Sequence, residues 1–334
     1  MTLMQEYLVI GSGTMARRYI TILNDILKNP KINCLPSSKN SSITTYPGIN
    51  NLFESLDEAL ESSPQSVFIA SPATTHLFYA TPFLKRRIPT LIEKPLSHSI
   101  EEIKKYKTIL DKSENYTEVA YCLRYLPSAK IFKEIIQNNE QVTSIYKVII
   151  EVGQYLPDWR PELDYRKSVS ANKAKGGGVL LELSHEIDYI NWIFGPINEV
   201  ICSLSNSGGL EINSEDSVDA IISAGKLPIN LHMDFLQRKP VRYCKVIGKE
   251  GNLIWDVLSD SIFFENHHKQ NSIIYQRIEF EKDYMYRKMI EEFLKMSIKS
   301  PKPNVKISDA NAVLDIIQAM RLSSKTKKTV KVIK

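Results

Sequence analysis

The clearest absences in this 334-residue chain are paired cysteines, long apolar runs and charge of one sign. Its four cysteines lie far apart in the sequence, which argues against a disulfide framework and against a zinc site. No stretch approaches the ~20 apolar residues that a membrane-spanning helix requires. We therefore expect a cytoplasmic protein that folds around an apolar core without disulfides or metal ions. The cysteines are Cys34, Cys122, Cys202 and Cys244.

The charge balance is also mild, with a formal net charge of +5. Part of the excess lies in the run 325–331, which is most simply a solvated tail. No stripe of basic residues alternates with aromatic ones, so the sequence does not indicate nucleic-acid binding. Apolar residues make up 43% of the chain and charged residues 24%, which is typical of globular proteins. The length suits two domains.

The first part of the chain, residues 1–123, alternates short apolar runs with segments of helical periodicity. This alternation predicts an α/β domain with a parallel, doubly wound sheet. The expected strands are 7–10, 32–35, 66–70, 90–92 and 119–122. The expected helices are 17–27, 52–60, 76–85 and 99–110.

The pattern changes in residues 124–334, where several strand-like runs follow one another. This order predicts a second, α+β domain with a mostly antiparallel sheet. The expected strands are 145–152, 199–204, 217–223, 229–236, 243–247, 252–257 and 329–333. The expected helices are 128–137, 179–194, 286–298 and 309–323.

A glycine-rich turn follows the first expected strand and opens the first expected helix. Gly11 permits a tight turn, Gly13 allows close approach of a pyrophosphate, and Ala16 allows close packing of helix on strand. The helix N-terminus adds a field that favours phosphate. We predict a dinucleotide contact along the turn, at Gly11, Ser12, Gly13, Thr14 and Met15.

The segment after the second expected strand contains no carboxylate. An Asp or Glu there normally binds the ribose 2′-hydroxyl of NAD. Ser37, Ser38 and Lys39 stand in this place, and small hydroxyls with a cation suit a 2′-phosphate. The sequence therefore slightly favours NADP over NAD, and the alternative is a surface loop without a role.

Polar residues at the end of the strand 66–70 are well placed to line a cofactor crevice. We predict that Ser71, Pro72, Thr74 and His76 contact the cofactor there. For His76 the alternative is a residue that starts a helix and has no chemical role.

Glu93-Lys94-Pro95 follows the strand 90–92, so the strand and the rigid proline fix the origin of a lysine. Hydride loss from a carbinol carbon requires a proton to leave its oxygen, and Lys94 could accept that proton. We also expect Glu93 and Lys94 to contact the cofactor. The alternative is a structural ion pair.

Three glycines, Gly176 to Gly178, precede an expected helix that carries Glu182, His185 and Asp188. Bare backbone at the glycines could approach a ligand. Glu182 and His185 are three residues apart and would share one helical face, where a carboxylate orients an imidazole. We predict a catalytic role for both, although a single helical histidine is often structural.

Aromatic and basic residues gather just before the triple glycine. The aromatic rings could stack on a sugar ring or a base, and the guanidinium groups could bind a carboxylate or phosphate. We infer an anionic sugar substrate, and the alternative is a loop with surface or interface ion pairs. The predicted substrate contacts are Arg124, Tyr155, Trp159, Arg160, Arg166, Lys173 and Asp188.

Taken in order, these motifs resemble those of the glucose–fructose oxidoreductase/inositol dehydrogenase family, Gfo/Idh/MocA. The segment 248–255 adds to the resemblance, which covers essentially the whole chain. It implies an N-terminal Rossmann domain, a C-terminal domain whose open sheet serves subunit association, and nicotinamide-dependent redox chemistry on a sugar. It implies acid/base catalysis by Lys94 and a substrate-binding or proton-relay role for His185 with Glu182.

Two departures from the family pattern stand out. The family commonly places an Asp four residues before the histidine, whereas Glu182 lies three residues before His185. The other departure is the missing acid near residue 37. The loop pattern around Trp159 and Arg166 is similar to that of members in surface-polysaccharide sugar synthesis, which suggests a nucleotide sugar, sugar acid or sugar phosphate.

Two other functions remain open at this stage. One is a redox-assisted glycosidase or epimerase that keeps NAD tightly bound. The other is a non-catalytic sensor of the dinucleotide, although a sensor has no chemical need for Lys94 or His185. We expect a homo-oligomer, dimer or tetramer, with a small sugar substrate and no nucleic-acid or membrane partner.

Overall fold

The computed structural model describes residues 5–38, 42–139, 141–266, 271–279, 281, 283–299 and 302–333. The chain divides into two compact units. The first unit comprises Met1–Tyr121 and Tyr286–Asn311, and the second comprises Cys122–Met285 and Ala312–Lys334. The sequence-based division at 123/124 is a single boundary, whereas in the structure residues 286–311 return to the first unit.

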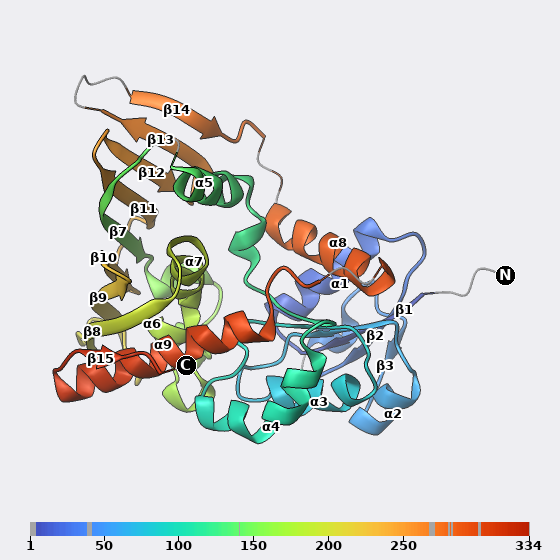
Figure 1. Ribbon diagram of the computed structural model, residues 1–334. Helices are drawn as coiled ribbons and strands as arrows, with labels where there is room; N and C mark the ends of the chain where they lie inside the picture. The colour runs from blue at the N-terminus through green and yellow to red at the C-terminus, as the bar shows by residue number, and fades with distance from the viewer. Residues whose placement is uncertain are drawn as a thin grey trace. The chain divides into compact units, whose positions relative to one another are not determined.

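The first unit is built on a parallel sheet of six strands in the order β3-β2-β1-β4-β5-β6 (Figure 1). Each neighbouring pair is parallel, as the alternation of strands and helices predicts. The strands are β1 (Glu6–Ile10), β2 (Lys31–Leu35), β3 (Asn51–Leu52), β4 (Ser66–Ile69), β5 (Thr90–Ile92) and β6 (Thr117–Val119).

Helices flank this sheet. They are α1 (Thr14–Ile26), α2 (Leu56–Glu61), α3 (His76–Lys85), α4 (Ile100–Ser113) and α8 (Tyr284–Lys299). Serines define two helix starts, since Ser55 and Ser99 accept hydrogen bonds from Glu58 N and Glu102 N. Phe293 of α8 packs edge-on against Phe68 of β4, with ring centroids 5.4 Å apart. This aromatic contact gives α8 its place in the first unit's core.

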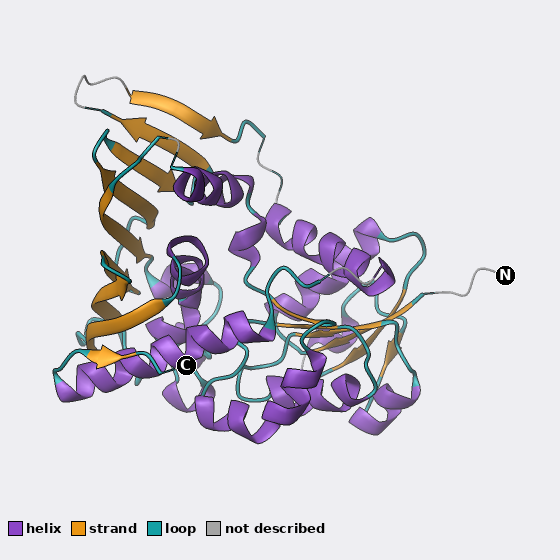
Figure 2. Ribbon diagram, in the orientation of Figure 1, coloured by secondary structure: helices purple, strands orange, loops and turns teal. Residues whose placement is uncertain are grey.

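The second unit contains a nine-stranded sheet with the order β14-β13-β12-β11-β7-β10-β9-β8-β15. Its strands are drawn in orange in Figure 2. Its pairs are antiparallel except β7 with β10. The predicted mostly antiparallel sheet is confirmed. The strands are β7 (Ile145–Gly153), β8 (Ile197–Ser205), β9 (Ser217–Ala224), β10 (Leu227–Asp234), β11 (Val241–Gly248), β12 (Asn252–Asp256), β13 (Ser261–Glu265), β14 (Asn271–Gln276) and β15 (Val330–Lys331).

One face of this sheet packs against helices (Figure 1). Its core centres on Trp255 of β12, whose indole N–H donates to Ser128 Oγ at 2.8 Å. The opposite face leaves Ile201 and Ile221 exposed. The second unit's remaining helices are α5 (Pro127–Asn138), α6 (Val179–Glu182) and α7 (Ser184–Phe194), and α9 (Ile307–Thr326) is shared by the two units.

Short 3-10 helices complete the described part of the chain. They are η1 (Ser42–Thr45), η2 (Cys122–Tyr125), η3 (Leu156–Trp159), η4 (Tyr165–Lys167) and η5 (Lys173–Lys175). Among the described residues, no helix has both the length and the apolar character that a bilayer crossing requires.

Candidate functional site

The glycine turn lies between β1 and α1. Gly11 N donates to Leu35 O at 3.1 Å, and a Cβ on Gly11 would lie 2.4 Å from Ala70 O. Any side chain at this position would therefore collide with the end of β4. Gly13 caps α1, and a Cβ there would meet nothing within 4 Å. The open space beside Gly13 would let a pyrophosphate approach the α1 N-terminus, where the first amides of α1, from Thr14 and Met15, would bind it.

Ser12 connects this turn to the loop after β2. Its Oγ accepts hydrogen bonds from Ser38 N at 3.0 Å and from Ser37 Oγ at 3.3 Å. The structure thus brings the predicted phosphate and ribose contacts together. Residues 35–38 contain no carboxylate. Lys39 lies outside the described residues.

His76, the first residue of α3, is 1% exposed. Its Nδ1 lies 2.9 Å from Pro95 O and its Nε2 lies 2.8 Å from Ser71 O. Burial lowers the pKa of His76 to about 4. Both ring nitrogens face main-chain carbonyls, so the His76 side chain connects the loops after β4 and β5.

The loop after β4 holds the other predicted cofactor contacts. Thr75 Oγ1 donates to Ser71 Oγ at 3.0 Å and lies 2.9 Å from Pro72 O, and Thr75 N donates to Pro72 O at 2.8 Å. These bonds form a tight turn at the carboxyl end of β4, where a doubly wound sheet binds its ligands. Thr74 lies within the turn and is half-buried.

Glu93 follows β5 and is buried. Its Oε1 accepts a hydrogen bond from the hydroxyl of Tyr19 in α1, and its Oε2 accepts one from Lys94 N at 3.1 Å. Burial raises the pKa of Glu93, while the Tyr19 hydroxyl and the Lys94 charge oppose that rise. The carboxylate therefore joins α1 to the loop that carries Lys94. Lys94 is half-buried and precedes Pro95 through a cis peptide bond.

In the second unit, the triple glycine is packed against neighbouring chain. A Cβ on Gly177 would lie 2.1 Å from Val169 O, and one on Gly178 would lie 2.4 Å from Glu215 Oε1. Gly178 also has φ +106°, a conformation that favours glycine. These two glycines serve close packing, which corrects the expectation that their backbone is bare for a ligand.

The predicted single helix over 179–194 is two helices, α6 and α7. Leu183 lies between them with φ −99° and ψ +26°, outside helical geometry, and its N–H bonds to Val179 O. The expectation that Glu182 and His185 share one helical face is therefore wrong. Both side chains are half-buried, Glu182 at the end of α6 and His185 in the first turn of α7.

Arg124 and Asp188, both predicted substrate contacts, form a buried ion pair with each other. Arg124 Nε lies 2.9 Å from Asp188 Oδ2, and Nη2 lies 2.6 Å from Oδ1. Their side chains are 4% and 2% exposed. The pair attaches η2 to α7, and direct contact of either residue with a substrate stays a prediction. A second pair, Glu186 with Arg242, attaches α7 to β11 at 2.7 Å.

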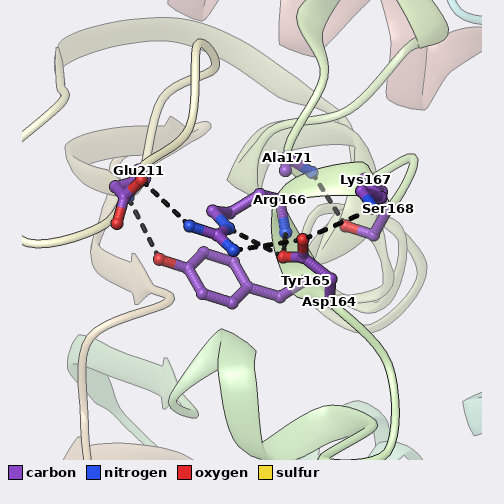
Figure 3. A network of polar contacts seen from close by, with 7 residues as sticks. All are labelled: Asp164, Tyr165, Arg166, Lys167, Ser168, Ala171 and Glu211. Atoms are coloured by element: carbon purple, nitrogen blue, oxygen red, sulfur yellow. Dashed lines mark hydrogen bonds and ion pairs between the residues drawn. The ribbon is translucent and has the colours of Figure 1, made fainter.

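The basic loop before the triple glycine places Arg166 between two acids (Figure 3). Its Nε lies 2.8 Å from Asp164 Oδ1, and its Nη1 lies 3.3 Å from Glu211 Oε2. The Arg166 hydrogen bond lowers the pKa of Asp164. Two carboxylates thus already engage this guanidinium, which weakens the prediction that Arg166 binds an anionic substrate.

The other predicted substrate residues lie in the same loop or close to it. Trp159 packs edge-on against Phe235, with ring centroids 5.3 Å apart. The Arg238 guanidinium stacks over the Tyr155 ring at 3.5 Å. Arg160 and Lys173 are exposed, and the structure describes no side-chain partner for either among the residues it covers.

Sequence reasoning missed three residues that support the candidate residues within their own units: Tyr19 in the first unit, and Arg242 and Glu215 in the second. Tyr19 lies on the apolar stripe of α1, so its spacing indicated core and gave no sign of a hydroxyl partner. Glu215 packs against Gly178 across 37 residues of sequence. No local sequence pattern indicates a contact between residues so far apart in the chain. Within the described residues, no cluster of His, Cys, Asp and Glu could hold a metal ion.

Fold and site together define a two-unit protein with a dinucleotide-binding Rossmann unit and a second unit on an open sheet. Residues 5–121 match the NAD-binding Rossmann domain of the Gfo/Idh/MocA oxidoreductases, and residues 144–332 match that family's C-terminal α/β domain. The chain belongs to the Gfo/Idh/MocA family, and the resemblance drawn from its motifs is confirmed.

Known relatives are similar over part of the chain. Glucose-6-phosphate 3-dehydrogenase of Bacillus subtilis is 28% identical over 196 residues, 57% of this chain and 54% of that protein. The rhizopine catabolism protein MocA of Rhizobium meliloti is 24% identical over 174 residues, 51% of each chain. The chain thus spans about half the length of these curated relatives.

Solved structures are similar over nearly the whole fold. A levoglucosan dehydrogenase in complex with NADH and levoglucosan has a TM-score of 0.84 at 16% identity, covering 98% of this chain and 99% of that one. The myo-inositol 2-dehydrogenase of Lactobacillus plantarum has a TM-score of 0.80 at 16% identity, covering 99% and 100%. At these identities the likeness establishes the fold.

Proposed function

We propose that this protein is a nicotinamide-dependent dehydrogenase that acts on a carbinol group of a sugar or sugar derivative. The observation that carries the proposal is the position of Lys94. It follows β5 at the carboxyl edge of the dinucleotide-binding sheet, and two buried groups, Glu93 and His76, fix its loop. The named activities of relatives, on glucose 6-phosphate, levoglucosan and inositol, support the substrate class.

The nicotinamide, when bound, accepts or supplies the hydride. In the oxidative direction Lys94 takes the proton from the substrate hydroxyl, and in the reductive direction it returns the proton to the carbonyl oxygen. His185 and Glu182 are proposed to bind the reacting oxygen or relay its proton. The pairs Arg124–Asp188 and Glu186–Arg242 hold α7, and with it His185, from two sides.

For the cofactor we propose NADP or NAD, with a slight preference for NADP. Support comes from residues 35–38, where Ser37 and Ser38 stand and no carboxylate is available for a ribose 2′-hydroxyl. The NAD-binding description of the matching domain and the NADH complex of the levoglucosan enzyme support NAD. Titration of the protein with NADH and with NADPH decides between them.

An anionic substrate is also proposed, but fewer basic residues support it than the sequence suggested. Arg124 and Arg166 are both engaged by acids, so the remaining candidates to bind a carboxylate or phosphate are Arg160 and Lys173. A nucleotide sugar in surface-polysaccharide synthesis is one member of this class, together with a sugar acid and a sugar phosphate.

The test is replacement of Lys94. Lys94→Ala should lower turnover by roughly 100-fold or more while dinucleotide affinity stays within about threefold, because it removes the proton acceptor and leaves the glycine turn intact. Steady-state rates on a panel of sugars and a fluorescence titration with NADH measure the two quantities. Lys107→Ala, an exposed lysine on α4, is the control and should change neither.

Normal turnover in Lys94→Ala would reject the acid/base assignment. Native mass spectrometry, together with the turnover assay, distinguishes the two alternative functions, the redox-assisted enzyme and the dinucleotide sensor. Dinucleotide that survives purification and never exchanges would favour the redox-assisted glycosidase or epimerase. Binding of dinucleotide without any turnover on sugars would favour the sensor.

A further inference from the structure

Helix α1 carries two adjacent arginines that face different sides of the first unit. The Arg17 guanidinium lies over the ring of Tyr46, 5.6 Å from its centroid. The Arg18 guanidinium stacks on Tyr286 of α8 at 4.4 Å and donates to Met15 Sδ at 3.0 Å. Because successive helical residues are about 100° apart, Arg17 faces the segment after β2 while Arg18 faces α8. The predicted cofactor contacts include neither arginine.

The side of α1 that bears Arg17 is in contact with the chain between β2 and β3. The Thr21 hydroxyl lies 2.8 Å from the Tyr46 hydroxyl, and Asn24 Nδ2 donates to Gly48 O at 3.1 Å. Arg17, Thr21 and Asn24 are spaced by four and three residues, so they lie on one face of the helix. The segment from Tyr46 to Gly48 therefore runs along this face.

Arg17 also leans toward the glycine turn. Its N–H donates to Gly13 O at 3.3 Å, which places it one turn into α1, and helical side chains lean toward the N-terminus of their helix. At that end Ser12 Oγ accepts hydrogen bonds from Ser37 and Ser38 of the loop after β2. A Rossmann unit binds the ribose 2′ group after its second strand. Arg17 is therefore directed at the ribose end of the predicted dinucleotide site.

The chain around this end contains almost no acidic residues. Between Tyr7 and Phe53, which includes α1, β2 and the loop after β2, Asp25 is the only Asp or Glu. Asp25 lies near the far end of α1 and 3.3 Å from Arg287. At the ribose end this segment therefore supplies no carboxylate to accept a hydrogen bond from the 2′-hydroxyl of NAD, and none to repel a 2′-phosphate.

An arginine that stacks on a ring is suited to bind a phosphate. Stacking uses the face of the guanidinium, whereas its N–H donors lie in the plane and match phosphate oxygens in pairs. The Tyr46 ring restricts the Arg17 side chain and so lowers the entropy that is lost on binding. NADP presents a phosphate at the ribose 2′ carbon and NAD a neutral hydroxyl, so an arginine in this place distinguishes the two cofactors.

We propose that Arg17 binds the 2′-phosphate of NADP, together with the hydroxyls of Ser37 and Ser38, and that it sets the cofactor preference. The inference rests on the proposed dehydrogenase and names the residue that selects its cofactor. The glycine turn binds the pyrophosphate that both cofactors share, so only recognition of the 2′-phosphate depends on Arg17.

The experiment compares NADPH with NADH, which differ only in the 2′-phosphate. Isothermal titration calorimetry measures both dissociation constants. We expect the wild type to bind NADPH ~10-fold or more tightly than NADH, since hydrogen bonds to a charged group are worth about that factor. Arg17→Gln should reduce the preference to within about threefold, because it removes the charge, while its affinity for NADH stays within about threefold of the wild type.

Two further variants make the assignment specific. Arg17→Met keeps an apolar stem over the Tyr46 ring and should give the same loss of preference as Arg17→Gln. The control is Arg18→Gln, which removes the same charge from the next position of α1 and should keep the NADPH preference, because Arg18 faces α8. An equal loss in the Arg17 and Arg18 variants would mean that the net charge of the helix sets the preference, and would reject the proposal.

Failure of this inference is distinguishable from failure of the proposed function. If the wild type binds NADH and NADPH with equal affinity, the role of Arg17 is rejected while the dehydrogenase proposal stands. The same holds if the NADPH preference persists in Arg17→Gln or in Arg17→Met. If the protein binds neither cofactor, the dehydrogenase proposal itself fails.

Discussion

At the scale of single residues, the loop that carries Lys94 depends on two buried groups that sequence patterns could not assign. Glu93 reaches Tyr19 of α1, and His76 lies between Pro95 O and Ser71 O. The sequence placed Lys94 after a strand because the apolar run and the proline are local signals. The partners of Glu93 and His76 lie 74 and up to 19 residues away, which local patterns do not report.

The residue-scale prediction concerns His76. With a pKa of about 4 the His76 ring is neutral and donates to one of the two oxygens, Pro95 O or Ser71 O. His76→Leu leaves that buried carbonyl without its donor, so we expect a loss of stability of ~1–3 kcal/mol. We also expect turnover per dinucleotide-binding site to fall at least tenfold, because the Lys94 loop loses its attachment to the loop after β4. Rates normalised to NADH stoichiometry measure this. The control, His98→Leu, removes a half-buried histidine that pairs with Glu102.

A purely structural role for His76 predicts a different result. The variant would then lose stability, while turnover per site would equal that of the wild type. His76→Asn, which restores one donor, should recover part of the lost turnover if the hydrogen bond to the loop is what matters.

At the scale of elements, the break between α6 and α7 decides where Glu182 and His185 lie. Apolar periodicity runs through both helices without interruption, so the sequence predicted one helix. The interruption lies at Leu183, whose ψ of +26° leaves helical geometry, and no local sequence signal marks it. Tertiary context routinely overrides local helix propensity.

The element-scale prediction concerns Gly178. Gly178→Ala adds a Cβ that lies 2.4 Å from Glu215 Oε1 at φ +106°, so the backbone is strained and either the Glu215 carboxylate or α6 must shift. We expect a loss of ~1–3 kcal/mol in the free energy of unfolding, together with lower turnover, since α6 carries Glu182. Gly208→Ala is the control because it shares a positive φ, +77°, and meets nothing within 4 Å. Urea unfolding of both variants tests this, and equal losses would contradict the role of Glu215.

At the scale of the whole molecule, each unit contains a histidine whose two nitrogens are both engaged, with opposite consequences. In the first unit, burial lowers the pKa of His76 to about 4. In the second unit, His232 of β10 lies 2.9 Å from Asp234 and 2.7 Å from Asp219, and hydrogen bonds to these acids raise its pKa to about 9. The difference is whether the acceptors are neutral carbonyls or carboxylates.

The molecule-scale prediction is a pH dependence of stability that originates in His232. Because the folded pKa of about 9 exceeds the ordinary value of 6.5, the stabilisation is fully present below pH 6.5 and is lost as the pH rises through 9. Thermal unfolding of the wild type and His232→Asn across pH 6–10 measures it. The difference in Tm should shrink towards pH 10, and a constant difference would contradict the prediction.

The sequence by itself determined most of the strand and helix order of the Rossmann unit, the glycine turn, the position of Lys94 and membership of the Gfo/Idh/MocA family. It missed the short strand β3 and, in the second unit, β13 and β14. The features that it determined depend on local periodicity, turn chemistry and spacing, which a linear chain displays directly. Only the tertiary structure decided that residues 286–311 return to the first unit and that Arg124 and Arg166 are engaged by acids. It also decided that α6 and α7 are separate and that Arg17 stacks on Tyr46. These features arise from contacts between residues far apart in the chain, and their partners are defined only when the chain is folded.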